Sequence, residues 1–159
     1  MQQAAHPYRT FVAMILAASV LMFALMYLNT YQWDHVWFSQ TRLFMTLIMA
    51  GAMALVMLVF MRHMYRDKRA NAAIVVASLA LMATGLWLVR SQATVGDVAW
   101  MKAMIPHHSI AILTSERARI RDPRVRKLAD GIIATQKREI GEMEALIRDL
   151  DHDAAAHSR

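Results

Sequence analysis

The chain has 159 residues, of which 57% are hydrophobic and only 19% are charged, and its mean hydropathy is +0.29. A soluble domain carries about 25% charged residues, so this composition argues against one ordinary soluble domain. Because cysteine is absent, disulfide scaffolds, thiolate nucleophiles, zinc fingers and iron–sulfur clusters are excluded. The net charge of +6 would suit nucleic acid, but basic residues flank the apolar blocks, which favours a membrane instead.

Three blocks without charged residues occupy the first part of the chain, at 10–31, 43–61 and 70–89. Each block is close to the roughly 20 residues that a helix needs to cross about 30 Å of hydrocarbon. Apolar residues occupy every face of these blocks, whereas a helix at the surface of a soluble protein keeps a polar stripe. The sequence therefore predicts a membrane domain over 1–90, with transmembrane helices at about 10–29, 43–62 and 70–90.

The loops between these blocks predict the orientation of the helices, because Lys and Arg prefer the cytoplasmic side. The loop at 62–69 is strongly basic, whereas the loop at 30–42 has one acidic and one basic residue and is rich in aromatic residues. This places the N-terminus in the cytoplasm and residues 91–159 in the periplasm of a bacterium with an inner membrane. The lipid bilayer is thus the first expected partner.

The segment 91–159 is richer in charge, and its acidic and basic residues nearly cancel, which argues against a nucleic-acid partner. Asp122 and Pro123 predict a turn followed by a new helix, because Asp caps a helix and Pro suits its first turn. We therefore expect an all-α fold in which an extracytoplasmic antiparallel hairpin follows the membrane helices. Its helices should cover about 95–120 and 123–150, with a short frayed tail, and Pro106 should kink or open the first of them.

Residues at steps of three and four mark one buried face of the second of these helices. They are Val125, Leu128, Ala129, Ile132, Gln136, Ile140, Met143, Ile147 and Leu150. Two helices alone bury too little apolar area to be stable. We expect a second copy to complete a four-helix bundle, so that the protein is a homodimer or a higher homo-oligomer. The alternative is packing of the hairpin on the membrane helices of its own chain.

The segment 97–112 carries the residues with metal-binding chemistry. One helical stripe holds four candidate ligands, a second histidine lies beside it, and the turn at 122 brings two more candidates opposite. These residues are Asp97, Met101, Met104 and His108, then His107, then Glu139 and Met143. A carboxylate from Asp97 or Glu139 would orient an imidazole by accepting its second N–H.

This set of ligands predicts the metal. Thioether sulfur is soft and imidazole is borderline, so together they favour a copper ion, as Cu(I), or by analogy Ag(I), over Mg²⁺ or Ca²⁺. Zinc is the weaker alternative, because it would leave the methionines unused. The structural alternative is that the cluster only fills the core, since Met on a helix face is usually a packing residue. His35, in the loop at 30–42, is a weaker candidate ligand, because a loop histidine is more often solvated.

An ordered chain of motifs extends these observations over residues 97–150. It consists of Met104-Ile-Pro-His107-His108-Ser-Ile-Ala111, Asp122-Pro123-x-Val125-x-x-Leu128-Ala129-x-x-Ile132 and Gln136-x-x-Glu139-Ile140-x-x-Met143. This pattern resembles the bacterial family catalogued as domain of unknown function 305. The resemblance implies a ferritin-like helical bundle and a link to copper binding and copper resistance. It implies His107, His108, Met104 and Met143 as the first ligands, with Asp97, Met101 and Glu139 behind them.

Many members of that family carry two hairpin units in one chain, whereas this sequence has one, which strengthens the expectation of a dimer. We expect a membrane-anchored periplasmic protein that binds Cu(I) in copper sequestration, handover or tolerance. We expect no enzymatic activity, because the sequence holds no catalytic motif. The alternative is a non-catalytic accessory or scaffold subunit of a membrane complex, in which the His/Met cluster is structural. An oxidoreductase acting at the metal is a weaker third interpretation.

Overall fold

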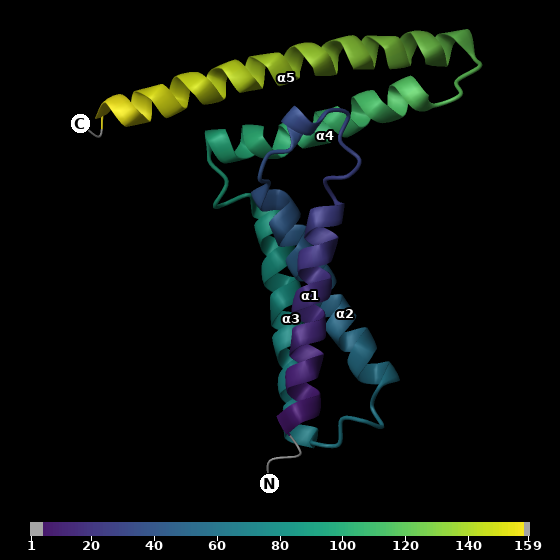
Figure 1. The fold of residues 1–159 in the computed structure, drawn as a ribbon, viewed down its shortest axis with the longest axis vertical. Helices are drawn as coiled ribbons and strands as arrows, with labels where there is room; N and C mark the ends of the chain where they lie inside the picture. Colours follow the sequence, from purple (N-terminus) through teal and green to yellow (C-terminus); the bar gives the residue numbers. More distant parts are fainter. Residues whose placement is uncertain (1–4, 158–159) are drawn as a thin grey trace. The chain divides into compact units, whose positions relative to one another are not determined.

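The computed structural model describes residues 5–157. Within these residues the chain forms five α-helices and one short 3₁₀-helix, with no strand (Figure 1). The elements in chain order are α1 (Ala5–Leu25), η1 (Trp33–His35), α2 (Gln40–Phe60), α3 (Lys68–Ser91), α4 (Asp97–Arg117) and α5 (Pro123–His157). The all-helical class predicted from the sequence is confirmed. The chain divides into two compact units.

The first unit, here called the apolar unit, consists of Met1–Met26 and Thr41–Thr94 and contains α1, α2 and α3. These three helices are long and apolar enough to span a membrane, as the sequence predicts. Many of their large side chains are exposed in the isolated chain, for example Val20 at 70% and Phe60 at 79%. Exposed apolar surface of this extent is typical of a helix whose outer face is covered by lipid.

Two glycines bring α2 and α3 close together. A Cβ atom built at Gly51 would lie 2.7 Å from the carbonyl oxygen of Ser78, and one at Gly85 would lie 3.0 Å from the carbonyl oxygen of Phe44. Both contacts are with backbone, which a side chain cannot push aside. Small residues at a crossing of this kind are the usual means by which membrane helices approach each other.

The helices α2 and α3 begin a few residues earlier than predicted, because polar side chains form hydrogen bonds at their first turns. The helix α2 begins at Gln40 rather than 43, and Arg42 in its first turn donates a hydrogen bond of 2.6 Å from Nη1 to the carbonyl oxygen of Met26. The helix α3 begins at Lys68 rather than 70, because the Asp67 side chain accepts hydrogen bonds from the backbone N–H groups of Arg69 and Ala70. A helix can therefore extend to a charged residue when that residue has a hydrogen-bond partner nearby.

The second unit, here called the helix-pair unit, consists of Tyr27–Gln40 and Val95–Arg159. Its two long helices lie side by side and run in opposite directions, joined by the short segment 118–122 (Figure 1). The backbone N–H of Arg124 donates to Asp122 Oδ1 at 2.8 Å, which is the predicted cap at the start of α5. The core between the helices consists of Met101, Ile105, Ile112, Ile140, Met143 and Ile147.

Two predictions about the length and continuity of these helices need correction. The helix α4 continues through Pro106 without opening, and the proline is fully buried beside Ile105. One lost backbone hydrogen bond is thus outweighed by packing of the ring against the core. The helix α5 runs to His157 rather than ending near 150, in agreement with the high helix propensity of the alanines in the sequence at 154–156.

The predicted buried face of α5 is buried only in part. Ala129, Ile140, Met143 and Ile147 are buried, but Val125, Leu128, Ile132 and Leu150 are exposed at 49%, 65%, 37% and 39%. The physical reason is that Leu128 and Ile132 each precede by one residue a side chain that faces α4, Ala129 or Ile133, and so lie about 100° away around α5. We call Val125, Leu128 and Ile132 the α5 outer strip. Trp100, on α4, is 50% exposed.

The segment Tyr27–Gln40 belongs to the helix-pair unit, whereas the sequence assigned it to the membrane domain. Tyr31 and Trp37 pack against the core between α4 and α5. Lys102 lies 5.6 Å from the ring centre of Trp37, and Lys137 lies 5.3 Å from that of Tyr31. The segment thus covers one side of the helix pair and supplies apolar contact that two helices alone would lack.

Candidate functional site

His108 lies on α4 and faces α5. Its side chain is only 13% exposed, and its Nδ1 atom lies 3.4 Å from Oε2 of Glu139. That Nδ1 atom is buried and has no hydrogen-bond partner within the described residues, because the contact with Glu139 has the distance of an ion pair without the geometry of a hydrogen bond. Of the two carboxylates proposed to orient an imidazole, Glu139 is the one near His108.

The protonation state of His108 follows from its burial. Burial lowers the pKa of His108 below its usual value, the nearby Glu139 carboxylate opposes that shift, and the neighbouring His107 adds to it. Burial is the largest of these effects. The imidazole is therefore neutral at pH 7, which is the form that binds metal ions.

His107 points differently from His108. Its side chain is exposed, and the two ring centres are 6.1 Å apart with the rings tilted by 59°. Consecutive residues on a helix are about 100° apart around its axis, since an α-helix has about 3.6 residues per turn, so both rings cannot face α5. The pair therefore offers one protected and one accessible imidazole at the same level of α4.

The three candidate methionines differ in exposure. Met101 and Met143 are buried at 5% and 6%, and both belong to the core between α4 and α5. Met104 is only partly buried and packs at the edge of that core, one helical turn before His108. Packing alone accounts for the first two side chains, so Met104 is the thioether that is most accessible to a ligand.

Asp97 does not join this group. It is exposed in the first turn of α4, eleven positions before His108, which corresponds to about 16 Å along a helix. Among residues 5–157 there is no set of three or more His, Asp or Glu side chains close enough to hold a metal ion. A metal site near His108 therefore needs thioether sulfur, or ligands from a second chain.

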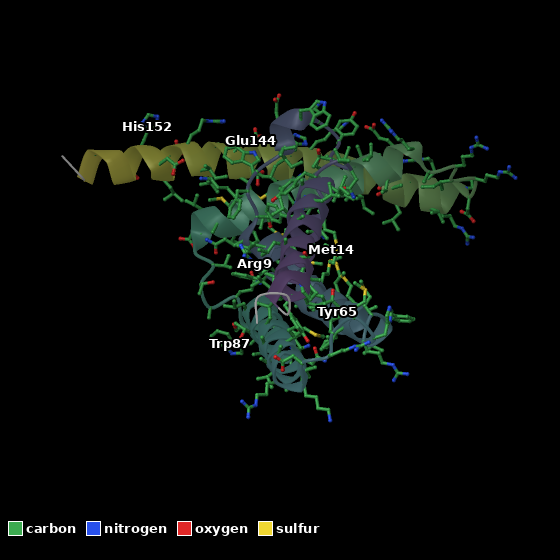
Figure 2. The ribbon with its side chains drawn as sticks, turned by 60° about the horizontal axis from the view of Figure 1, so that its bottom comes forward. Arg9, Met14, Tyr65, Trp87, Glu144 and His152 are labelled. Carbon is green, nitrogen blue, oxygen red and sulfur yellow. The ribbon has the colours of Figure 1, made fainter. Side chains whose placement is uncertain are left out.

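The structure also contains a cleft that the sequence did not indicate. It has a volume of about 360 Å³ and lies between the segment Tyr27–Gln40 and the two long helices. Figure 2 shows Glu144, which lines it, on α5, and His152 nearer the C-terminal end of that helix. The lining residues are Tyr31, Gln32, His35, Ile112, Lys137, Ile140, Gly141 and Glu144.

His35 is fixed in this cleft by a buried serine, rather than being solvated as expected. His35 is 8% exposed. Its Nδ1 atom lies 2.9 Å from Oγ of Ser109, which is completely buried. The same Oγ atom accepts a hydrogen bond of 2.6 Å from the backbone N–H of Tyr31. Ser109 Oγ and His35 Nδ1 therefore share a hydrogen bond whose donor depends on the tautomer of the ring.

A second set of contacts ties the same segment to α4 and links α4 to α5 through Lys137. Lys137 donates to Glu116 Oε1 at 3.0 Å, and the hydroxyl of Tyr31 donates to the same oxygen at 3.3 Å. The hydrogen bond from Lys137 lowers the pKa of Glu116, and the reciprocal contact raises the pKa of Lys137. Both groups are therefore charged at pH 7.

Sequence reasoning missed these contacts because the partners are far apart in the chain. Tyr31 and Ser109 are separated by 78 positions, and His35 and Ser109 by 74. The only signal was His35 itself, within a loop rich in aromatic residues.

Comparison with known proteins places this helix pair in a family. Residues 97–158 match the family model described as domain of unknown function (DUF305). Among individual proteins, the chain is 31% identical over 106 residues to "Uncharacterized protein L153" of Acanthamoeba polyphaga mimivirus, which covers 65% of this chain and 68% of the viral protein. The chain belongs to the DUF305 family. The resemblance stated from the motifs is thereby confirmed.

The matched region of this DUF305 protein corresponds to α4 and α5, which carry His107, His108 and Glu139. Because the alignment with the viral protein is longer than the family segment, that similarity extends beyond α4 and α5. No solved structure matches the chain.

Proposed function

We propose that this DUF305 protein is a membrane-anchored periplasmic protein that binds Cu(I) through His108, His107 and neighbouring thioethers. The observation that supports the proposal best is the His108 side chain, a largely buried neutral imidazole beside a carboxylate. A small rotation of either side chain would align Nδ1–H so that it donates to Glu139. The Nε2 lone pair would then be oriented for a metal ion, as in many histidine sites.

The thioethers make copper the favoured ion. Met104 lies one turn from His108 and is accessible, so it is the first sulfur ligand that we propose. Met101 and Met143 would reach the ion only if the core opened, and Asp97 is too far along α4 to take part without a second chain. Imidazole with thioether suits Cu(I), and by the same argument Ag(I), better than harder ions.

The proposed location rests on the charges of the loops. A basic stretch at 62–69 favours the cytoplasm, which places the N-terminus inside and α4 and α5 in the periplasm of a bacterial inner membrane. In that place the protein would sequester copper, hand it over or contribute to copper tolerance, without catalysing a reaction.

A second copy would supply what one chain lacks. The α5 outer strip of Val125, Leu128 and Ile132 is apolar and exposed, and the described residues contain too few imidazoles and carboxylates at one point to hold an ion. A homodimer or higher oligomer that buries this strip in a four-helix bundle, as in ferritin-like proteins, would meet both needs.

A titration of the full-length protein in detergent with Cu(I), against a competing chelator, tests this function. We expect the His107→Ala/His108→Ala double variant to bind at least tenfold more weakly. His152→Ala, which removes an exposed histidine elsewhere on α5, is the matched control and should bind as the wild type does. Equal binding by all three proteins would contradict the proposal.

A second candidate function is that of a non-catalytic accessory or scaffold subunit of a membrane complex. The burial of Met101 and Met143 among isoleucines of the core favours it, because packing alone would then explain these side chains. Purification under mild conditions would distinguish the two, since a scaffold should retain other subunits in fixed stoichiometry and lose them when the α5 outer strip is made polar.

A further inference from the structure

The cleft beneath the segment Tyr27–Gln40 is independent of the proposed metal site. None of its lining residues is among the proposed copper ligands, which lie on α4 and α5 around His108. Its floor is apolar, formed by Ile112 and Ile140, and its walls carry charged and polar groups. It is thus a separate candidate for binding a small molecule.

Gly141 gives a first reason to infer a ligand there. It lies in the middle of α5, where glycine is a poor helix former compared with alanine. A Cβ atom built at Gly141 would meet nothing within 4 Å, so packing within the chain does not require a glycine. Because Gly141 lines the cleft, its missing side chain keeps the cleft open.

The charges of the cleft give a second reason. Lys137 and Glu144 line it seven residues apart on α5, two turns along one face, which corresponds to about 10 Å of helix. Lys137 uses one of its three N–H donors for Glu116, and in the part of the chain that the structure describes no lysine or arginine forms an ion pair with Glu144. The cleft therefore offers a cation at one end and a carboxylate at the other.

His35 adds a polar group between the ends. The ring of His35 lines the cleft, and its Nδ1 atom is held by Ser109 Oγ, so Nε2 is the ring nitrogen that remains for a ligand. A metal ion would need a lone pair from this imidazole and would be repelled by Lys137. A simple anion would be repelled by Glu144. A molecule with both charges satisfies all three groups.

We propose that this cleft binds a small zwitterion of about dipeptide size, with its carboxylate at His35 and Lys137 and its ammonium group at Glu144. A small apolar side chain of the ligand would lie on Ile112 and Ile140, above Gly141. A free dipeptide and a dipeptide-like metabolite share this chemistry, and the probes below test the shared groups.

Binding is measured on the full-length protein in detergent micelles, with a metal chelator present so that copper chelation by the peptide is excluded. The probes are L-alanyl-L-alanine, its N-acetyl derivative, which lacks the ammonium group, and its C-terminal amide, which lacks the carboxylate. We expect the free dipeptide to bind at least tenfold more tightly than either derivative. Equal binding of the three, or no binding of any at millimolar concentration, would overturn the proposal.

Two pairs of variants locate the binding. Glu144→Gln should remove the preference for the free dipeptide over its N-acetyl derivative, whereas Asp149→Asn, an exposed control on the same helix, should keep it. Gly141→Leu should fill the cleft and abolish binding, whereas Gly131→Leu should leave it unchanged. Both glycines have open space where a Cβ atom would lie, with no neighbouring atom within 4 Å, and only Gly141 lines this cleft.

An equal effect of the two leucine variants would refute the assignment of this site. Copper binding should be the same in all four variants. A negative result for dipeptide binding would therefore not contradict the proposed copper function.

Discussion

The two units of this chain are stabilised by different means. In the apolar unit, most large side chains are exposed in the isolated chain, and α2 meets α3 where two glycines allow the backbones to approach. In the helix-pair unit, a core of buried Ile and Met side chains is covered by a segment that is held by hydrogen bonds. The difference fits three helices that are long and apolar enough to span a membrane, because lipid would cover apolar surface that water would drive into a core.

The largest effect that separates the units is expected from truncating a core residue. Ile112 is fully buried, so Ile112→Ala should destabilise the helix-pair unit by about 3 kcal/mol through lost burial and the cavity left behind. Val20→Ala, in α1, removes a side chain that is 70% exposed and should change little. Unfolding of both variants in detergent, followed by circular dichroism, compares them. Similar losses would show that the two units do not differ in this way.

A glycine substitution should give the next largest effect, in the apolar unit. Gly51→Ala would place a Cβ against the Ser78 carbonyl oxygen, so we expect a loss of about 2 kcal/mol from overpacking. Gly131→Ala is the control in the helix-pair unit, where open space surrounds the new methyl group and better helix propensity should stabilise α5 slightly. The same unfolding assay measures both, and a stabilising Gly51→Ala would contradict close packing of α2 and α3.

Removing the buried hydroxyl of Ser109 tests how the segment Tyr27–Gln40 is held on the helix pair. Ser109→Ala leaves the Tyr31 N–H and His35 Nδ1 without a partner, which should cost about 1.5 kcal/mol. Hydrogen exchange of the Tyr31 amide should become faster, with α4 otherwise protected. Ser115→Ala, on the same helix, should leave that exchange rate unchanged. Unchanged protection in Ser109→Ala would mean that other contacts hold the segment.

The smallest expected effect concerns the titration of His108. Burial holds its pKa below the unfolded value, so folding favours the neutral ring, and stability should fall as pH drops below the usual histidine pKa. Glu139→Gln removes the charge that opposes this shift and should lower the pKa of His108 further. A pH titration of the ring Hε1 resonance by NMR measures the shift, and a rise in pKa would contradict the role of Glu139.

The sequence predicted what depends on local pattern. Three uncharged blocks were enough for the three apolar helices, Asp122 and Pro123 located the turn, and the motif around His107 located the family segment. Each of these signals lies within a few residues, where propensity, hydropathy and capping act directly.

What the sequence did not predict depends on contacts between distant residues. The burial of His35 requires Ser109, and the exposure of Leu128 follows from its position about 100° around α5 from the buried Ala129. Periodicity marks which side chains share a face, but it does not say how wide a face the partner helix covers. Pro106 was expected to kink or open α4, and the helix is continuous through it.

The position of Tyr27–Gln40 in the chain has a consequence for biosynthesis. The ribosome produces this segment well before Ser109, so a nascent chain that has reached only α3 holds Tyr31 and His35 without their serine partner. The final folding step of the helix-pair unit must therefore follow the synthesis of Ser109 in α4. Labelled nascent chains can be arrested before and after residue 109 and treated with protease. The shorter chains should be cleaved more readily within Tyr27–Gln40 than the longer ones.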